Sequence, residues 1–348
     1  MEPRRRSTEM RAVVYSQTGG PDVLRLVERP VPEPGRGEVR VAVQISGVNP
    51  TDWKSRRGST GGELPFPEVV PNQDGAGTID SVGEGVDAAR VGERVWLWEA
   101  AWQRADGTAQ AYVVLPERQA VHLPTGVSFD EGASLGIPAL TAHRCLTVSE
   151  LGPIRLAPGA LAGRTVLVAG GAGAVGHAAI QLARWAGGRV ITTVSGDAKA
   201  TLAHAAGADD VVNYRSPDAV DEIHRLAPDG LDIVVEVAPA ANAALDSAVL
   251  AANGTAAVYA TDGGNEFDLS VRELMFRNVR YQFVLVYTVP AAAKEQAVAD
   301  VTAAAAAGAL PVGVDAGLPL HRFSLEQTAE AHGAVEGGVV GKVLIDVS

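Results

Sequence analysis

Residues 165–177 have the sequence Thr165-Val-Leu-Val-Ala-Gly-Gly-Ala-Gly-Ala-Val-Gly-His177, which predicts a strand, a tight glycine turn and the start of a helix. The first five residues form a short apolar run, typical of a strand that is buried on both faces. Gly171, Gly173 and Gly176 follow with the spacing G-x-G-x-x-G. In this pattern the first glycine permits the turn, the second lets backbone N–H groups approach a pyrophosphate, and the third lets the helix lie close to the strand.

The residues after this turn favour a dinucleotide site over an incidental glycine loop. Residues 174–186 carry apolar side chains at helical spacing, and two glycines end this helix before a second apolar strand at residues 189–194. Such a helix presents unpaired N–H groups to an anion at its start. We therefore predict that the phosphates of a dinucleotide bind to Gly171, Ala172, Gly173, Ala174, Val175 and Gly176.

Composition and charge limit the class of protein. The chain has 348 residues, 47% hydrophobic and 20% charged, which predicts a globular protein long enough for two domains. A formal net charge of -12 argues against nucleic acid or an anionic membrane as a partner. We found neither an apolar run of membrane-spanning length nor a signal peptide, so we expect a cytoplasmic protein. The single cysteine, Cys145, excludes an internal disulfide and a multi-cysteine zinc site.

Short strands separated by glycine and proline turns dominate the first third of the chain, after a lead-in at residues 1–9 that we expect to be disordered. This pattern predicts a β-rich domain, with strands at 12–15, 24–27, 38–48, 75–82, 94–98 and 111–115. Helices are expected at 129–136 and 140–148. Strands and helices then alternate, as in a doubly wound parallel sheet, with strands at 165–169, 189–194, 210–214, 231–237, 255–260 and 280–287.

The last part of the chain has a helix-forming run at residues 291–307 and then returns to short strands around a helix near 325–336. We expect this tail to rejoin the β-rich domain. The predicted division is a catalytic domain at residues 10–135 and 310–348, interrupted by a cofactor domain at 136–309. In such an arrangement the active site is expected in the cleft between the two domains.

Several short motifs occur in the order typical of one superfamily: Arg11-Ala-Val-Val-Tyr15, Gly47-Val-Asn-Pro-Thr-Asp52, Pro71-Asn-Gln-Asp-Gly-Ala-Gly77, Val91-Gly-Glu-Arg-Val95, Leu140-Thr-Ala142, the glycine turn, Ala331-His332 and Gly341-Lys342. With these motifs the chain resembles the medium-chain dehydrogenase/reductase superfamily, and within it the zinc-free quinone oxidoreductase (zeta-crystallin-like) branch. The resemblance implies a GroES-like catalytic domain joined to a Rossmann domain, usually as a homodimer.

The resemblance also makes missing residues informative. Zinc alcohol dehydrogenases of this superfamily have a cysteine where this chain has Asn49, and a histidine and a glutamate where it has Gln73 and Asp74. A catalytic zinc needs three ligands from histidine, cysteine or carboxylate side chains, and of these positions only Asp74 supplies one. We therefore predict no metal site and a reaction without zinc.

The residue at the end of the second Rossmann strand indicates the cofactor. Proteins that prefer NAD normally have Asp or Glu there to hold the ribose hydroxyls, and this chain has Ser195. A hydroxyl, an ammonium and a phenol can together bind a 2′-phosphate, and Lys199 and Tyr214 supply the other two groups. Relatives in the branch have Ser, Lys and Tyr at corresponding positions, so we predict NADPH, with a solvated Lys199 and a half-buried Tyr214 as the alternative. Asp197 is counter-evidence unless it faces solvent.

Asn49 stands where the resemblance implies an asparagine close to the nicotinamide, and its carboxamide can donate to a substrate carbonyl. The alternative is a turn-former before Pro50. Asp52 is a candidate to orient Asn49 or a neighbouring cation, but its position favours a structural turn role. The resemblance further implies that Val284 and Lys342 contact the cofactor and that Tyr287 is a candidate proton donor.

Together these residues predict an NADPH-dependent, zinc-free reductase of quinones or electron-poor enones. The alternatives are an enoyl-thioester reductase or a catalytically silent NADPH-binding redox sensor or structural protein.

Overall fold

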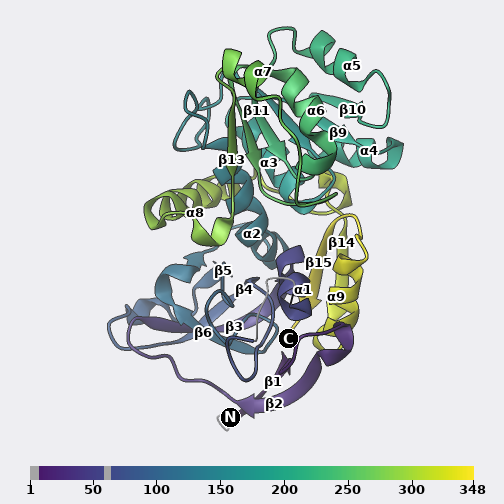
Figure 1. Ribbon diagram of the computed structural model, residues 1–348. Helices are drawn as coiled ribbons and strands as arrows, with labels where there is room; N and C mark the ends of the chain where they lie inside the picture. The colour runs from purple at the N-terminus through teal and green to yellow at the C-terminus, as the bar shows by residue number, and fades with distance from the viewer. Residues whose placement is uncertain (1–7, 59–63) are drawn as a thin grey trace. The chain divides into compact units, whose positions relative to one another are not determined.

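The computed structural model describes residues 8–58 and 64–348, which fall into two units. Unit 1 contains residues up to 137 together with 320–348, and unit 2 contains residues 138–319 (Figure 1). Of the lead-in at residues 1–9 that was expected to be disordered, residues 1–7 lie outside the described residues. Glu9 begins strand β1 (Glu9–Val14), so the lead-in is shorter than predicted.

Unit 2 is built on a six-stranded parallel sheet with the order β10-β9-β8-β11-β12-β13. Its strands are β8 (Thr165–Ala169), β9 (Arg189–Val194), β10 (Asp210–Asn213), β11 (Leu231–Glu236), β12 (Leu250–Val258) and β13 (Arg280–Phe283). The strand order reverses at β8, directly before the glycine turn. Ligands of doubly wound sheets bind at such a reversal, so the predicted Rossmann sheet is confirmed with the turn at its functional edge.

The helices of unit 2 that lie wholly within it are α3 (Ala174–Trp185), α4 (Asp197–Ala205), α5 (Ala219–Leu226), α6 (Pro239–Val249), α7 (Val271–Phe276) and α8 (Ala291–Ala306). Helix α3 packs on β8 and β9, and α6 packs on β11, β12 and α5. The core consists of branched side chains such as Leu167, Ile191 and Val234, all fully buried. Each contributes about 1.5–3 kcal/mol by leaving water.

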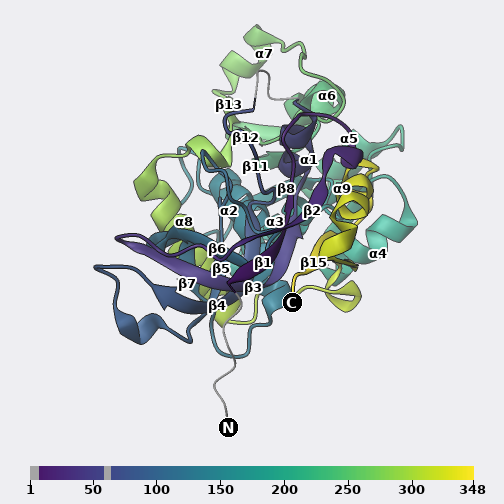
Figure 2. The same cartoon turned by 90° about the horizontal axis from the view of Figure 1, so that it is seen from below.

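Unit 1 contains a sheet with the order β14-β15-β3-β4-β5-β7, in which β6 also pairs with β3, and a separate β1-β2 pair. The remaining strands are β2 (Arg25–Pro30), β3 (Glu38–Val48), β4 (Asp74–Val82), β5 (Arg94–Leu97), β6 (Tyr112–Pro116), β7 (Ala120–His122), β14 (Leu320–Ser324) and β15 (Lys342–Asp346). Strand β15 runs antiparallel to β3, with Val343 opposite Val48. The C-terminal strands β14 and β15 thus extend the sheet at its β3 side (Figure 2).

Several expected elements have different bounds in the structure, and one helix was not expected. The helices predicted at 129–136 and 140–148 are one helix, α2 (Phe129–Leu146), that continues through Pro138. The last Rossmann strand ends at Phe283 rather than 287, and a short 3₁₀ turn follows at Val286–Thr288. Helices α1 (Pro50–Arg57) and α9 (Thr328–Glu336) lie in unit 1, and α1 was not predicted. Among the described residues, no helix is both long and apolar enough to cross a bilayer.

Candidate active site

Asn49 links the end of β3 to the first turn of α1. Its backbone is extended, with φ -123° and ψ 161°, and Pro50 occupies the first helical position. The carboxylate of Asp52 accepts the Asn49 backbone N–H at 2.7 Å, which is one half of a capping box. The turn predicted at Asn49 is therefore the start of α1, with Asn49 as the N-cap residue. This cap fixes the position from which the Asn49 side chain leaves the backbone.

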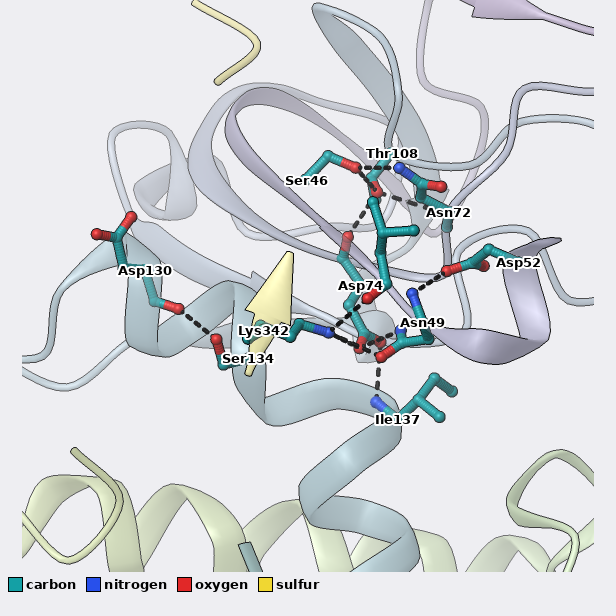
Figure 3. Close-up of polar contacts among 11 residues, drawn as sticks. Ser46, Asn49, Asp52, Asn72, Asp74, Thr108, Asp130, Ser134, Ile137 and Lys342 are labelled. Carbon is teal, nitrogen blue, oxygen red and sulfur yellow. Dashed lines mark hydrogen bonds and ion pairs between the residues drawn. The ribbon is translucent and has the colours of Figure 1, made fainter. Parts of the chain in front are cut away.

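The carboxamide of Asn49 is held on both sides by charged groups (Figure 3). Its Nδ2 donates to Asp74 Oδ2 at 2.7 Å, and its Oδ1 accepts from Lys342 Nζ at 2.7 Å. These three side chains, which we call the Asn49 triad, come from the ends of three neighbouring strands, β3, β4 and β15. Each is at most 2% exposed.

Lys342, which was predicted to contact the cofactor, is directed at Asn49. Three oxygens surround its ammonium: Asn49 Oδ1 at 2.7 Å, Val48 O at 3.3 Å and Asp74 Oδ2 at 3.6 Å. The first two contacts are hydrogen bonds and the third is an ion pair, and three oxygens around one ammonium suit a protonated lysine. Burial lowers the pKa of Lys342, and the carboxylates of Asp74 and Asp52 oppose that shift. A cofactor contact for Lys342 stays a prediction.

Asp74 accepts hydrogen bonds at both carboxylate oxygens. The backbone N–H of Ile137, in α2, donates to Oδ1 at 2.8 Å, and Asn49 and Lys342 occupy Oδ2. Burial raises the pKa of Asp74, whereas Lys342 and these two hydrogen bonds lower it. Because every partner is a donor, the geometry suits the ionised carboxylate.

A second layer of polar side chains holds the backbone beside Asp74. Thr108 Oγ1 donates to the Asp74 carbonyl at 2.5 Å and lies 2.7 Å from Ser46 Oγ. Asn72 Nδ2 donates to Ser46 at 2.9 Å, and its Oδ1 lies 2.9 Å from Nε2 of His332 in α9. Burial lowers the pKa of His332 to about 3, so the ring is neutral and Nε2 is the donor. This series of hydrogen bonds connects the start of β4 to α9.

Asp52 is the other buried acid at this site, 3% exposed. One carboxylate oxygen caps α1, while Oδ1 has no hydrogen-bond partner among the described residues. Burial is the main cause that raises the pKa of Asp52 to about 8, and the charge of Asp74 adds to it. Asp52 contacts the backbone of Asn49 rather than its carboxamide, so it orients Asn49 through the helix cap.

The positions that hold zinc in related dehydrogenases carry a different set of side chains here. Gln73 Oε1 accepts the backbone N–H of Ala101 at 3.1 Å, and Asp74 and Asn49 are bonded within the triad. Amide oxygens are not among the ligands that catalytic zinc selects. Within residues 8–58 and 64–348, no three His, Cys, Asp or Glu side chains lie close enough together to hold a metal ion. The residues present do not fit a zinc site.

In unit 2, the glycine turn has the shape required for a phosphate. Gly170, not Gly171 as predicted, makes the sharp turn, since its φ is +70°. A Cβ on Gly171 would lie 2.2 Å from Thr192 Oγ1 in β9 and 2.8 Å from Ile180 Cδ1 in α3, and one on Gly176 would lie 2.4 Å from the Gly170 carbonyl. Both glycines therefore allow α3 to lie close to β8.

The start of α3 fits the phosphates of a dinucleotide. Gly173 is its N-cap and provides no side-chain cap, so the backbone N–H groups of Ala174, Val175 and Gly176 have no partner within the helix. Gly173 is exposed, and a Cβ there would contact only the Gly170 carbonyl, at 3.4 Å. An open helix N-terminus without a capping side chain is suited to an anion.

The residues predicted to bind a 2′-phosphate lie at one corner of the sheet. Val194 pairs with Asn213, so Ser195 and Tyr214, the next residue of each strand, are neighbours. Tyr214 is 44% exposed. Lys199 lies in the first turn of α4, which begins at Asp197, and Asp197 is exposed. The structure thus places Ser195 and Tyr214 after the ends of two neighbouring strands, and Lys199 at the start of the helix that follows the first of them.

The pair predicted at the end of the last Rossmann strand is buried. Val284 is 7% exposed, and its N–H donates to the Val258 carbonyl at 2.7 Å. Tyr287 is 8% exposed, and its carbonyl accepts from Lys294 Nζ at 3.1 Å. Tyr287 sits on the 3₁₀ turn and not on a strand. Its role as a proton donor stays a prediction.

Comparison with known proteins decides the family. The quinone oxidoreductases of Lama guanicoe and Homo sapiens are each 30% identical to this chain over 340 residues, and the match covers 97% of this chain and of each relative. The chain belongs to the quinone oxidoreductase branch of the medium-chain dehydrogenase/reductase superfamily. It is an oxidoreductase, and the relatives imply a small-molecule substrate.

Domain and structure comparisons agree with this assignment. Residues 35–125 of the oxidoreductase match the alcohol dehydrogenase GroES-like domain, and residues 174–303 match the zinc-binding dehydrogenase domain. An NAD-dependent alcohol dehydrogenase has a TM-score of 0.85 at 31% identity, covering 97% of this chain and 100% of its own. A mycobacterial protein in complex with NADPH has a TM-score of 0.79 at 29% identity, covering 97% and 99%. The predicted fold class, Rossmann and GroES-like, is confirmed.

Two features of the oxidoreductase's site were missed from the sequence. Asp74 was considered only as a zinc-ligand position, whereas the structure makes it the partner of Asn49. Helix α1 was missed although Asn49, Pro50 and Asp52 form a helix-start pattern: a capping residue, proline at the first position and an acid at the third. That local signal was sufficient to find α1. No local sequence pattern of this kind identifies Asp74 as the partner of Asn49.

Proposed function

We propose that this oxidoreductase transfers hydride from NADPH to a quinone or an electron-poor enone without zinc. The observation that carries the proposal is the Asn49 carboxamide, which is hydrogen-bonded to both Lys342 and Asp74. It occupies the position at which zinc-dependent dehydrogenases of the superfamily have a metal ligand. A fixed N–H donor can stabilise negative charge that develops on a substrate oxygen, which is the task that zinc performs in the relatives. The names of the quinone oxidoreductase relatives support the substrate class.

NADPH supplies the hydride when it is bound. The backbone N–H groups at the start of α3 would bind its pyrophosphate, and Ser195, Lys199 and Tyr214 its 2′-phosphate. Asn49 would donate its N–H to the carbonyl oxygen of the substrate, and solvent would supply the proton that completes the reduction. The mycobacterial NADPH complex supports NADPH as the cofactor. Because another structural neighbour is an NAD-dependent alcohol dehydrogenase, the experiments below also measure NADH.

A substrate panel tests the reaction. We expect NADPH oxidation, followed by its near-ultraviolet absorbance, with a quinone and with a conjugated alkenal. Turnover only with an enoyl-thioester would favour the enoyl-thioester reductase alternative. NADPH binding without turnover on any of the three would indicate a silent sensor or structural protein. Activity that is lost on chelation and restored by zinc would contradict the zinc-free mechanism.

Lys199→Met tests the cofactor. We expect the Kd for NADPH to rise ~10-fold, because the ammonium that pairs with the 2′-phosphate is lost, and the Kd for NADH to stay within ~2-fold. Fluorescence titration of the reduced cofactors measures both constants. Arg225→Met, which removes an exposed charge from α5, is the control and should change neither. An equal loss of affinity for NADPH and NADH would overturn the assignment of Lys199.

We also propose a homodimer that forms through the edge of the Rossmann sheet. Strand β13 ends the sheet, and large apolar side chains on and around it are more than half exposed: Val271, Met275, Phe276, Phe283 and Leu285. An unpaired edge with apolar neighbours is typical of a surface that another chain covers. A second copy is the occupant that the family resemblance implies.

Phe283→Lys should convert the dimer to a monomer, because it places a charge in the apolar contact. Light scattering coupled to size-exclusion chromatography measures the mass. Val314→Lys is the matched control, since both residues are 64% exposed and Val314 lies on the 3₁₀ turn Val314–Ala316 rather than on β13. A parent protein that is monomeric at every concentration, or a Phe283→Lys variant that stays dimeric, would contradict this interface.

A further inference from the structure

The Asn49 carboxamide has one orientation that its charged neighbours accept. The oxygen and nitrogen of a carboxamide are nearly the same size, so shape alone does not distinguish the two flipped states. Lys342 can only donate and the ionised Asp74 can only accept. A flip would place the ammonium against an NH₂ group and the carboxylate against an oxygen, and both contacts would be repulsive.

We propose that Lys342 and Asp74 are positioning residues for hydride transfer, which fix the Asn49 carboxamide so that its second Nδ2 hydrogen is directed at the substrate oxygen. This inference rests on the proposed function. Nδ2 carries two hydrogens, and Asp74 accepts one of them at 2.7 Å. Within the described residues, no acceptor is found for the other.

Lys342 also strengthens the remaining donor. A cation bonded to the carboxamide oxygen, here at 2.7 Å, withdraws electron density from the amide and polarises its N–H groups. The effect is large in a dry site, and the triad is at most 2% exposed. The buried ammonium therefore acts on the reaction through Asn49 and needs no contact with substrate or cofactor.

The backbone around the triad is shaped to admit these groups. A Cβ on Gly47, in β3, would lie 3.2 Å from Lys342 Cε and 3.3 Å from Asp74 Cβ, and 2.2 Å from the Ala133 carbonyl. A Cβ on Gly136, in α2, would lie 2.1 Å from Asp74 Oδ1. Glycine at these two places allows β3, β4, β15 and α2 to approach closely enough for the triad to form.

A double-mutant cycle tests whether Lys342 acts through Asn49. Lys342→Met removes the charge and keeps the length of the side chain. We expect Lys342→Met to lower kcat ~10- to 100-fold with the Kd for NADPH within ~2-fold, and Asn49→Ala to lower kcat more. In the double variant the loss should equal that of Asn49→Ala alone, because a positioning residue has no effect once its target is gone.

The outcomes separate this inference from the proposed function. If Asn49→Ala lowers kcat and the two losses multiply in the double variant, Lys342 acts independently and the positioning role is overturned. A higher Kd for NADPH with unchanged kcat in Lys342→Met would also overturn the positioning role. It would instead support the cofactor contact that was expected from the sequence. If Asn49→Ala leaves kcat unchanged, the proposed function itself fails.

Gly136→Ala tests the same role without removing a charge, in case Lys342→Met does not fold. The added methyl would displace the Asp74 carboxylate, and we expect kcat to fall ~10-fold with the NADPH Kd within ~2-fold. Gly132→Ala is the matched control one turn earlier in α2, where the methyl would meet the apolar side chains of Ala76 and Leu123. Equal effects of the two variants on kcat would reject a specific role for Asp74.

Discussion

Replacing Asn49 with alanine is expected to lower kcat by ~10²- to 10³-fold, the loss that follows removal of one preorganised donor to an oxyanion. The expectation is large because the carboxamide is buried and both of its polar atoms are bonded to charged partners, so no solvent reorganisation is needed when charge develops. Steady-state kinetics with a quinone and saturating NADPH measure kcat, and fluorescence titration measures the Kd for NADPH, which should stay within ~3-fold.

The control must separate catalysis from stability, because both polar atoms of the Asn49 carboxamide bond to buried charged partners. Asn49→Ser keeps a small polar side chain at the start of α1 and loses the carboxamide. We expect both variants to lose about 1–3 kcal/mol of stability, because the partners of the carboxamide are left unbonded, and we expect the serine variant to have a kcat as low as that of the alanine variant. A serine variant with near-parental kcat would show that the carboxamide has no part in the reaction.

Local sequence patterns predicted unit 2 well. The bounds of β8 and β9 are those expected, and the glycine turn lies at the strand-order reversal. Buried parallel strands are continuous apolar runs that end at glycine, so each strand carries its own signal. The turn itself was placed one residue late, because the G-x-G-x-x-G spacing marks close packing at Gly171 and Gly176 and says nothing of the φ of Gly170.

The Asn49 triad was beyond such patterns. Lys342 and Asn49 are 293 residues apart in sequence, and they meet because β15 pairs antiparallel with β3 at Val343 and Val48. Register between distant strands depends on the whole sheet, and a shift by one residue would turn Lys342 to the other face. Asp74 depends in the same way on its pairing with Gly47. The residue types were visible in the sequence, but their juxtaposition was not.

Replacing Asp52 with asparagine is expected to stabilise the protein increasingly as the pH rises. Burial raises the pKa of Asp52 from its ordinary value of 3.8 to about 8, so between these values the folded state binds a proton that the unfolded state has released. The stabilising contribution of Asp52 is therefore complete below its ordinary pKa and is lost as the pH rises through its folded pKa. Asparagine resembles the protonated acid, keeps an oxygen to cap α1, and does not titrate.

Denaturant unfolding of parent and variant from about pH 5 to pH 8 measures this effect. Each pH unit in the window changes the difference in unfolding free energy by up to about 1.4 kcal/mol, and we expect a total of at least ~2 kcal/mol in favour of Asp52→Asn. Asp87→Asn is the matched control, because Asp87 also caps a helical turn but is exposed. Its difference from the parent should stay within ~0.5 kcal/mol across the range.

The physical reason lies in the charge balance beside Asn49. Asp52 and Asp74 face a single ammonium, that of Lys342, so this buried cluster is neutral only while one of its carboxyl groups carries a proton. Asp74 is surrounded by donors, which leaves Asp52, with its unpartnered Oδ1, as the group that holds the proton. A stability difference that does not change with pH would mean that Asp52 is ionised in the folded protein and that the cluster keeps a net negative charge next to the Asn49 carboxamide.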